Sequence, residues 1–274
     1  MKASSKGKAV ITGASGGIGA IFADRLAKRG HDLILVARNG ERLESVATRL
    51  RSETGRSIDV TVADLNQRAG LARVEEVLRT DASITALVNT AGIGAPTRLL
   101  DSHVDRLEEM IDLNATALMR LTYAALPSFL KRGGGTIINM ASAAAIASQF
   151  FNAVYDGTKA FVVEFSRRLH SEFAEKNIRV QVILPGITAT ELWDSTALQQ
   201  FPQESVMNAD EMVDAALAGF DQGEFITIPS LPDLADLEVY EAARQKLIPN
   251  VSRSSPAARY RTAREHHQFR SLRS

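Results

Sequence analysis

The chain has 274 residues, of which 45% are hydrophobic and 23% are charged, as is ordinary for a folded globular protein. Its 32 basic and 32 acidic residues balance to zero, which argues against a nucleic-acid-binding protein steered by bulk charge. There is no cysteine, so disulfides and thiolate metal sites are excluded, and no metal site is predicted. With no secretory signal and no apolar run of membrane-spanning length, we expect a cytoplasmic protein without a membrane partner.

Strand and helix patterns alternate along the chain. Residues 8–12 form a short apolar strand, followed by a glycine-rich turn and a helix with Ile18, Phe22 and Leu26 on one face. Further strands are predicted at residues 33–37, 58–62, 86–88, 136–140, 178–184 and 225–228, and a long helix at 105–131. Seven strands with helical crossovers predict an α/β fold, a doubly wound, mostly parallel Rossmann-type sheet with helices on both faces.

The glycine-rich turn has the spacing Gly-x-x-x-Gly-x-Gly at Gly13, Gly17 and Gly19. It lies between a strand and a helix, which is the context that a dinucleotide-binding turn requires. Glycines let the backbone approach a pyrophosphate, and the helix N-terminus presents unpaired N–H groups and a positive dipole end. A purely structural turn is the alternative interpretation.

A second pattern places Tyr155 four residues before Lys159, so that a helix carries both side chains on one face. An ammonium near a phenol favours the phenolate and is expected to lower the pKa of Tyr155. Tyr155 then becomes a usable proton donor and acceptor near neutral pH. Taken alone, this pattern also fits an ordinary half-exposed helix face.

Five motifs together, in this order, resemble the short-chain dehydrogenase/reductase family over residues 7–230. They are Thr12–Gly19, Asn89–Gly92, Asn114, Ser142 placed 13 residues before Tyr155, and Pro185–Gly186 with Thr190. The chain departs from the family pattern at Thr90, where a second asparagine is usual, and at Gly157–Thr158, where Ala-Ser is usual. Neither departure removes a catalytic group.

The resemblance implies hydride transfer between a nicotinamide cofactor and a carbonyl or secondary alcohol. Tyr155 is then the acid/base, Lys159 lowers its pKa and holds the nicotinamide ribose, Ser142 orients the substrate oxygen, and Asn114 holds a water. The predicted cofactor-binding residues are Gly13, Ser15, Gly16, Gly17, Ile18, Gly19, Arg38, Asp64, Leu65, Asn89, Ala91, Gly92, Tyr155, Lys159, Pro185, Gly186, Thr188 and Thr190.

The end of the second predicted strand indicates which cofactor is preferred. NAD-specific dinucleotide folds carry an acidic residue there, which binds the ribose 2′-hydroxyl. Here that position is Ala37, and Arg38 follows it. An arginine pairs well with a 2′-phosphate, so we predict NADP(H) over NAD(H), unless Arg38 is a solvated strand-end charge.

The region of about 188–207 corresponds to the substrate lid of the family. It contains Leu192, Trp193, Leu198 and Phe201, and with Phe150 and Phe151 it suggests a neutral, fairly apolar small-molecule substrate, although these side chains also fit plain core packing. Family members associate through the helices around Asn114 and Tyr155, so a homodimer or homotetramer is expected.

Residues 1–250 are predicted to form one NAD(P)-binding catalytic domain, followed by a basic tail at 251–274. From Arg253 onward the tail has six arginines and one glutamate, which fits a solvated tail, an arm on a neighbouring subunit, or a weak anion or nucleic-acid site. An apolar stripe at Leu234, Leu237 and Tyr240 precedes it. Two alternatives stay open: a non-catalytic NADP(H)-binding sensor or scaffold, and a ketoreductase acting on carrier-bound acyl chains.

Overall fold

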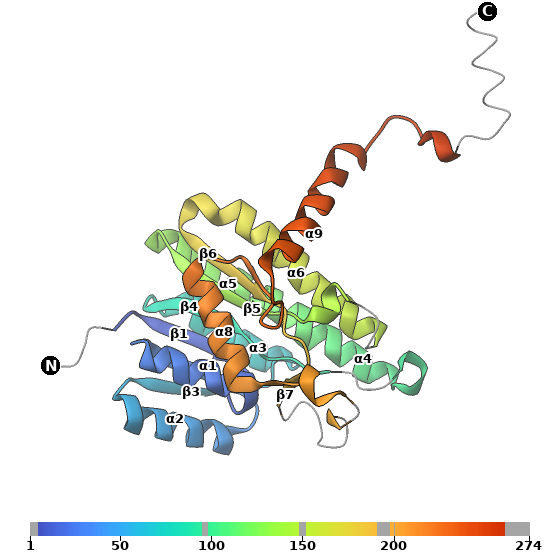
Figure 1. Ribbon diagram of the computed structural model, residues 1–274. Helices are drawn as coiled ribbons and strands as arrows, with labels where there is room; N and C mark the ends of the chain where they lie inside the picture. Colours follow the sequence, from blue (N-terminus) through green and yellow to red (C-terminus); the bar gives the residue numbers. More distant parts are fainter. Residues whose placement is uncertain (1–4, 95–97, 148–151, 191–197, 200, 261–274) are drawn as a thin grey trace, which may run out of the picture. The chain divides into compact units, whose positions relative to one another are not determined.

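A computed structural model describes residues 5–94, 98–147, 152–190, 198–199 and 201–260 (Figure 1). The chain divides into two compact units, Met1–Ser230 and Leu231–Ser274. The predicted domain boundary near residue 250 stays a prediction.

A seven-stranded parallel sheet forms the centre of the first unit, with the strand order β3-β2-β1-β4-β5-β6-β9. The strands are β1 (Lys8–Thr12), β2 (Asp32–Ala37), β3 (Ile58–Val62), β4 (Ile84–Asn89), β5 (Gly135–Met140), β6 (Ile178–Ile183) and β9 (Ile226–Thr227). The strand order reverses between β1 and β4. Residues Ala9–Thr12 of β1 pair with β2 on one side and with β4 on the other. The predicted doubly wound α/β fold is confirmed.

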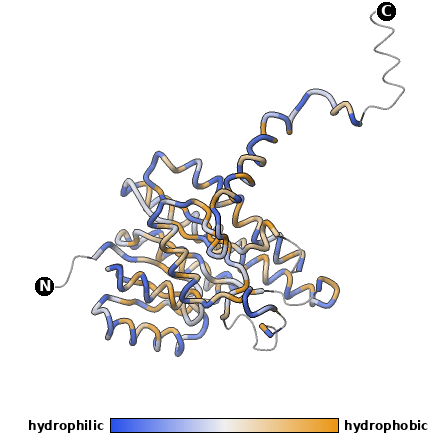
Figure 2. The backbone as a smooth tube through the Cα atoms, viewed as in Figure 1, coloured by the Kyte–Doolittle hydropathy of each residue, from blue (hydrophilic) through white to orange (hydrophobic). Residues whose placement is uncertain are grey.

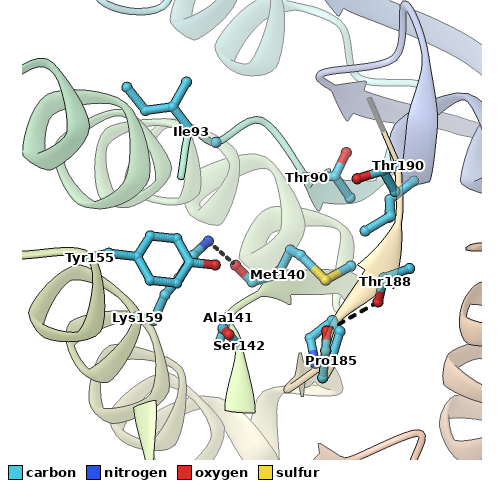
Figure 3. A pocket seen from close by; sticks show the side chains of 13 residues that line it. Thr90, Ile93, Met140, Ala141, Ser142, Tyr155, Lys159, Pro185, Thr188 and Thr190 are labelled. Atoms are coloured by element: carbon cyan, nitrogen blue, oxygen red, sulfur yellow. Dashed lines mark hydrogen bonds between the residues drawn. The ribbon is translucent and has the colours of Figure 1, made fainter. Parts of the chain in front are cut away.

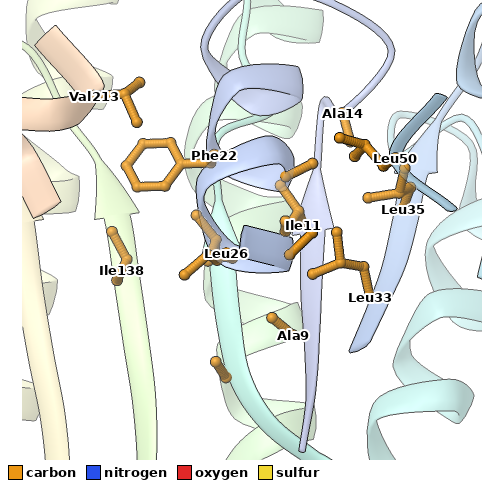
Figure 4. Close-up of a cluster of buried hydrophobic side chains, with 14 of the residues drawn as sticks. Ala9, Ile11, Ala14, Phe22, Leu26, Leu33, Leu35, Leu50, Ile138 and Val213 are labelled. Carbon is orange, nitrogen blue, oxygen red and sulfur yellow. The ribbon is translucent and has the colours of Figure 1, made fainter. Parts of the chain in front are cut away.

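Helices cover both faces of this sheet. One face packs against α1 (Gly17–Lys28), α2 (Gly40–Thr54) and α8 (Ala209–Gln222), and the other against α3 (Arg68–Thr80), α5 (Leu118–Arg132) and α6 (Ala153–Phe173). Because successive strand residues point to opposite faces, Ile11 joins the first core and Val10 the second. Phe22 and Leu26 of α1 fill the first core next to Ile11 and Val213 (Figure 4).

The surface helices bury one face each, so hydrophilic and hydrophobic residues alternate along them (Figure 2). Their ends follow from local sequence. Asn39 caps the start of α2, where its side chain accepts a hydrogen bond from the backbone N–H of Arg42 at 3.0 Å. Gly55 ends the same helix in the left-handed conformation, at φ 65°.

The predicted long helix at 105–131 consists of three consecutive segments. These are α4 (Val104–Ile111), a π-helical segment (Asp112–Ala117) and α5, in which Pro127 lies. A small two-stranded sheet of β7 (Thr188–Ala189) and β8 (Met207–Asn208) was not predicted, because strands of two residues carry no readable alternation.

The second unit contains α9 (Leu234–Leu247), which Asp233 caps by accepting a hydrogen bond from the N–H of Ala235 at 2.9 Å. The predicted apolar stripe lies on this helix: Leu237 is buried, while Leu234 and Tyr240 are exposed. Two short 3-10 turns follow at Ile248–Asn250 and Ala258–Tyr260. Most of the basic tail, residues 261–274, lies outside the described chain.

Candidate active site

Many of the predicted site residues lie just after the carboxyl ends of the parallel strands, on both sides of the point where the strand order reverses, while Tyr155 and Lys159 lie on α6. This is the position at which open α/β sheets bind their ligands. The turn after β1 and the loop after β4 are tied together through Thr12, whose hydroxyl accepts hydrogen bonds from the N–H groups of Thr90 and Ala91, both at 3.1 Å. The Thr90 hydroxyl donates in turn to the Thr12 main-chain oxygen. Thr90 thus helps to hold these two segments together.

The glycine turn fits a bound pyrophosphate. Gly13 has φ 71°, and a Cβ there would lie 2.9 Å from the Cα of Ala91. A Cβ on Gly19 would collide with the Gly13 carbonyl oxygen. No side chain caps the start of α1 at Gly16, so its first N–H groups are available to an anion. The residues present therefore fit a dinucleotide cofactor.

Three adjoining cavities follow this edge of the sheet, and Gly92 and Ile93 line all three. The first lies at the ends of β2 and β3 and includes Ser15, Arg38, Arg42, Asp64 and Leu65. The second follows the glycine turn with Gly16, Gly17, Ile18 and Gly19. The third holds Ser142, Tyr155, Lys159, Pro185, Gly186, Thr188 and Thr190. Together they form one path from Arg38 to Tyr155.

At the far end of this path, Tyr155 and Lys159 of α6 lie across the cavity from Thr188 and Thr190 (Figure 3). Lys159 is almost fully buried, and its Nζ donates a hydrogen bond to the main-chain oxygen of Met140 at 3.1 Å. This burial lowers the pKa of Lys159 from 10.5 to about 8. The charged form of Lys159 is therefore less favoured than that of an exposed lysine.

Burial raises the pKa of Tyr155, and a hydrogen bond with the Ser142 side chain lowers it by a smaller amount. The expectation that Lys159 lowers this pKa below its ordinary value is wrong for this structure, because loss of hydration of the phenolate is the largest influence. The Ser142 hydroxyl also accepts a 3.2 Å hydrogen bond from the Ala144 N–H, which fixes its position at the end of β5.

Two predicted site residues do not line these cavities. Asn89 is buried in the sheet and donates hydrogen bonds to Thr122 at 3.2 Å and Asn139 at 2.9 Å. Asn114, in the π-helical segment, bonds both the N–H and the carbonyl of Ile93 at 2.9 Å. It also donates to Thr158 at 3.3 Å. Asn114 thus fastens the loop after β4 to α6, and its predicted water stays a prediction.

Arg42 and Ile93 are among the cavity residues that sequence reasoning missed. Arg42 lies four residues after Arg38, in the first turn of α2, and lines the same two cavities. Its signal was a second arginine four residues after the first, at the start of a helix. Of the predicted lid, Leu192 and Trp193 lie outside the described residues, as do Phe150 and Phe151.

Within the described residues, no group of three or more metal-ligating side chains comes together. Nor does this part of the chain contain a helix long and apolar enough to cross a membrane.

A row of adjoining cavities at the switch point of a Rossmann-type sheet, with Ser142, Tyr155 and Lys159 in the last of them, is the arrangement expected of a nicotinamide-dependent oxidoreductase. The family model for short chain dehydrogenase matches residues 7–200. The chain therefore belongs to the short-chain dehydrogenase/reductase family. It is an NAD(P)-dependent dehydrogenase/reductase that acts on CH–OH groups, with alcohol or ketone substrates.

Similar proteins include two solved structures that cover nearly the whole chain. A short-chain dehydrogenase from Sphingobium yanoikuyae, in complex with NADPH, is 43% identical with a TM-score of 0.89, covering 93% of this chain and 100% of that one. The bulky-bulky ketone specific alcohol dehydrogenase from Comamonas testosteroni is 39% identical with a TM-score of 0.87, covering 94% and 100%. The very-long-chain 3-oxoacyl-CoA reductase of Anas platyrhynchos is 36% identical over 67% of this chain and 60% of its own length.

Proposed function

We propose that this protein is an NADP(H)-dependent reductase of neutral, apolar ketones, with Tyr155 as the acid/base. The observation that carries the proposal is the continuous path from two arginines, Arg38 and Arg42, to the hydroxyl groups of Ser142 and Tyr155. One end of this path has the chemistry to bind a phosphate, and the other has the chemistry to move a proton.

The preference for NADP(H) rests on charge at the ends of β2 and β3. Ala37 stands where an acidic residue would repel a 2′-phosphate, and Arg38 and Arg42 line the same cavity as Ser15. Guanidinium groups form charge-assisted, forked hydrogen bonds with phosphate oxygens. The bound NADPH of the similar Sphingobium protein supports the same preference.

The catalytic roles follow from what each side chain contacts. When bound, the nicotinamide cofactor supplies or accepts a hydride. Tyr155 gives its phenolic proton to the substrate oxygen, and the Ser142 hydroxyl, hydrogen-bonded to Tyr155, orients that oxygen. Lys159, which lines the cavity, would hold the nicotinamide ribose, and Asn114 acts as a positioning residue through Ile93 and Thr158.

The substrate class is inferred from the lining of the catalytic cavity. Ile18, Ile93, Met140, Ala141 and Pro185 give it an apolar wall. Among the described residues that line it, Lys159 is the one cation, and it is engaged with Met140, so no basic group is placed to hold a substrate carboxylate or phosphate. The similar Comamonas enzyme is specific for bulky-bulky ketones, which supports an apolar ketone here.

We further propose a homodimer or homotetramer that forms through α4, α5 and α6. These helices expose Ile111, Tyr123 and Phe161, large apolar side chains that a subunit interface would cover. Light scattering after size-exclusion chromatography tests this: the wild type should elute as a multiple of its 29.7 kDa mass, and Tyr123→Glu should weaken the assembly.

The proposed activity is tested by mixing the protein with NADPH and a panel of neutral ketones, and following the absorbance of the reduced cofactor. We expect turnover that falls sharply with NADH and is lost in Tyr155→Phe. Turnover that prefers NADH or keeps its rate in Tyr155→Phe would contradict the cofactor assignment or the acid/base assignment, respectively.

A further inference from the structure

Helix α9 leaves most of its side chains exposed. Of its 14 residues, all of which the structure describes, Leu237 alone is buried. Val239 and Leu247 are 70% and 61% exposed, and Ala243, which lies between them, is exposed as well. A helix of this length is marginally stable in water unless an apolar face packs against a partner. The exposed apolar side chains of α9 are therefore available to such a partner.

Three of these exposed residues form an apolar stripe along one side of α9. Val239, Ala243 and Leu247 are spaced four residues apart, so they follow one another on the same face of the helix. The stripe is symmetric about Ala243, because a large aliphatic side chain lies one turn to either side of a small one. Two such helices that cross antiparallel at Ala243 would pack Val239 of each copy against Leu247 of the other.

The charges of this segment are separated about the same residue. Among residues 231–260, all four acids precede Ala243 and all four bases follow it: Asp233, Asp236, Glu238 and Glu241, then Arg244, Lys246, Arg253 and Arg259. An antiparallel pair brings the acidic half of one copy against the basic half of the other, whereas a parallel pair would bring like charges together. This distribution also suits the dipole of a single helix. The charges therefore select the orientation of a pair, and the apolar stripe indicates that a pair forms.

We propose that α9 is an interface between two copies of this chain, which pair antiparallel through Val239, Ala243 and Leu247. A two-fold interface uses the same patch on both copies, so that patch must be complementary to itself. The apolar stripe and the separated charges of α9 both meet this requirement about Ala243. The inference goes beyond the proposed activity, and this interface is distinct from the one proposed across α4, α5 and α6.

The test is cross-linking of the full-length protein at a single introduced cysteine, since the chain contains no cysteine of its own. In Ala243→Cys the two thiols would face each other at the crossing point, where a disulfide or a short bis-maleimide can join them. The matched control is Ala235→Cys, at an exposed alanine of the same helix. Ala235 lies eight residues from Ala243, so its two copies would be about 24 Å apart in an antiparallel pair. We expect a yield of covalent dimer at least about tenfold higher for Ala243→Cys than for this control.

A second pair of variants tests the contribution of the apolar stripe. Leu247→Asp, added to Ala243→Cys, should abolish the cross-link, because it replaces an apolar contact and sets an acid against the acidic half of the other copy. Ile248→Asp, at an exposed aliphatic residue about 100° further round the helix axis, should leave the cross-link unchanged. Circular dichroism and NADPH binding confirm that each variant is folded.

Two results would overturn the inference: equal yields from Ala243→Cys and Ala235→Cys, or no covalent dimer from folded Ala243→Cys. Neither result bears on the proposed activity, which NADPH turnover decides, or on the interface across α4, α5 and α6, which Tyr123→Glu decides.

Discussion

The Nζ atom of Lys159 lies 5.6 Å from the centre of the Tyr155 ring, at the end of the cofactor path. This ammonium group is buried and has a single described hydrogen bond, to the Met140 main-chain oxygen. A cation in that position is well placed for a nicotinamide ribose and poorly solvated by the protein itself. In the proposed function Lys159 therefore takes part in the reaction, although its burial as a cation destabilises the fold.

Replacement of Lys159 by methionine should stabilise the protein while it abolishes turnover. A lysine pKa lowered from 10.5 to about 8 corresponds to a destabilisation of the folded protein by about 3 kcal/mol at neutral pH. Replacing Lys159 removes this destabilisation, but it also removes the hydrogen bond to Met140, which contributes about 1 kcal/mol. We expect Lys159→Met to raise the free energy of unfolding by about 2 kcal/mol, measured in urea at pH 7.

The stability that Lys159→Met gains over the wild type should decrease as the pH rises. Above pH 8 the folded protein loses the Lys159 proton, while the unfolded chain keeps it up to about pH 10.5. Wild-type stability therefore rises with pH relative to Lys159→Met across this window, and the difference fades toward pH 10.5. A stability difference that stays constant from pH 7 to pH 10 would contradict the burial argument.

Cofactor preference should depend on both arginines of the first cavity. Removal of a charged hydrogen-bonding partner costs about 1.5–3 kcal/mol, so Arg38→Ala and Arg42→Ala should each weaken NADPH binding by about tenfold to a hundredfold. NADH binding should change little, and Arg38→Asp should reverse the preference. Calorimetric titration with both cofactors measures this without turnover.

The matched control for these variants is Arg106→Ala, an exposed arginine of α4 outside all three cavities, which should leave both affinities unchanged. Equal losses for NADPH and NADH in Arg42→Ala would show that Arg42 supports the loop rather than the 2′-phosphate.

Substitutions at two glycines distinguish a loss of cofactor binding from a change in helix stability. Gly19→Ala should sharply weaken NADPH binding, because the new methyl group would push the Gly13 carbonyl out of the turn. Gly157→Ala places its methyl in open space inside α6 and should stabilise the protein by about 0.5–1 kcal/mol, with catalysis retained. Thermal unfolding and NADPH titration of both variants check this pair, and normal NADPH affinity in Gly19→Ala would contradict the close packing of the turn.

The sequence predicts those parts of the site that depend on spacing along one element. Tyr155 and Lys159 share a helix face, and the glycine turn joins a strand to a helix, so both could be recognised in advance. Arg42 lines the same cavities as Arg38 because α2 begins directly after Asn39, whose side chain accepts a hydrogen bond from the Arg42 N–H. The π-helical turn at Asn114 was not predictable from a periodicity of 3.6. The raised pKa of Tyr155 depends on burial, which spacing alone does not reveal.

The most direct test of the central claim is the rate of NADPH consumption with the best ketone of a panel, compared between wild type and Tyr155→Phe. We expect steady turnover by the wild type and a loss of at least about a hundredfold in the variant, with NADPH affinity unchanged. A variant that binds NADPH normally and reduces the ketone at the wild-type rate would contradict it.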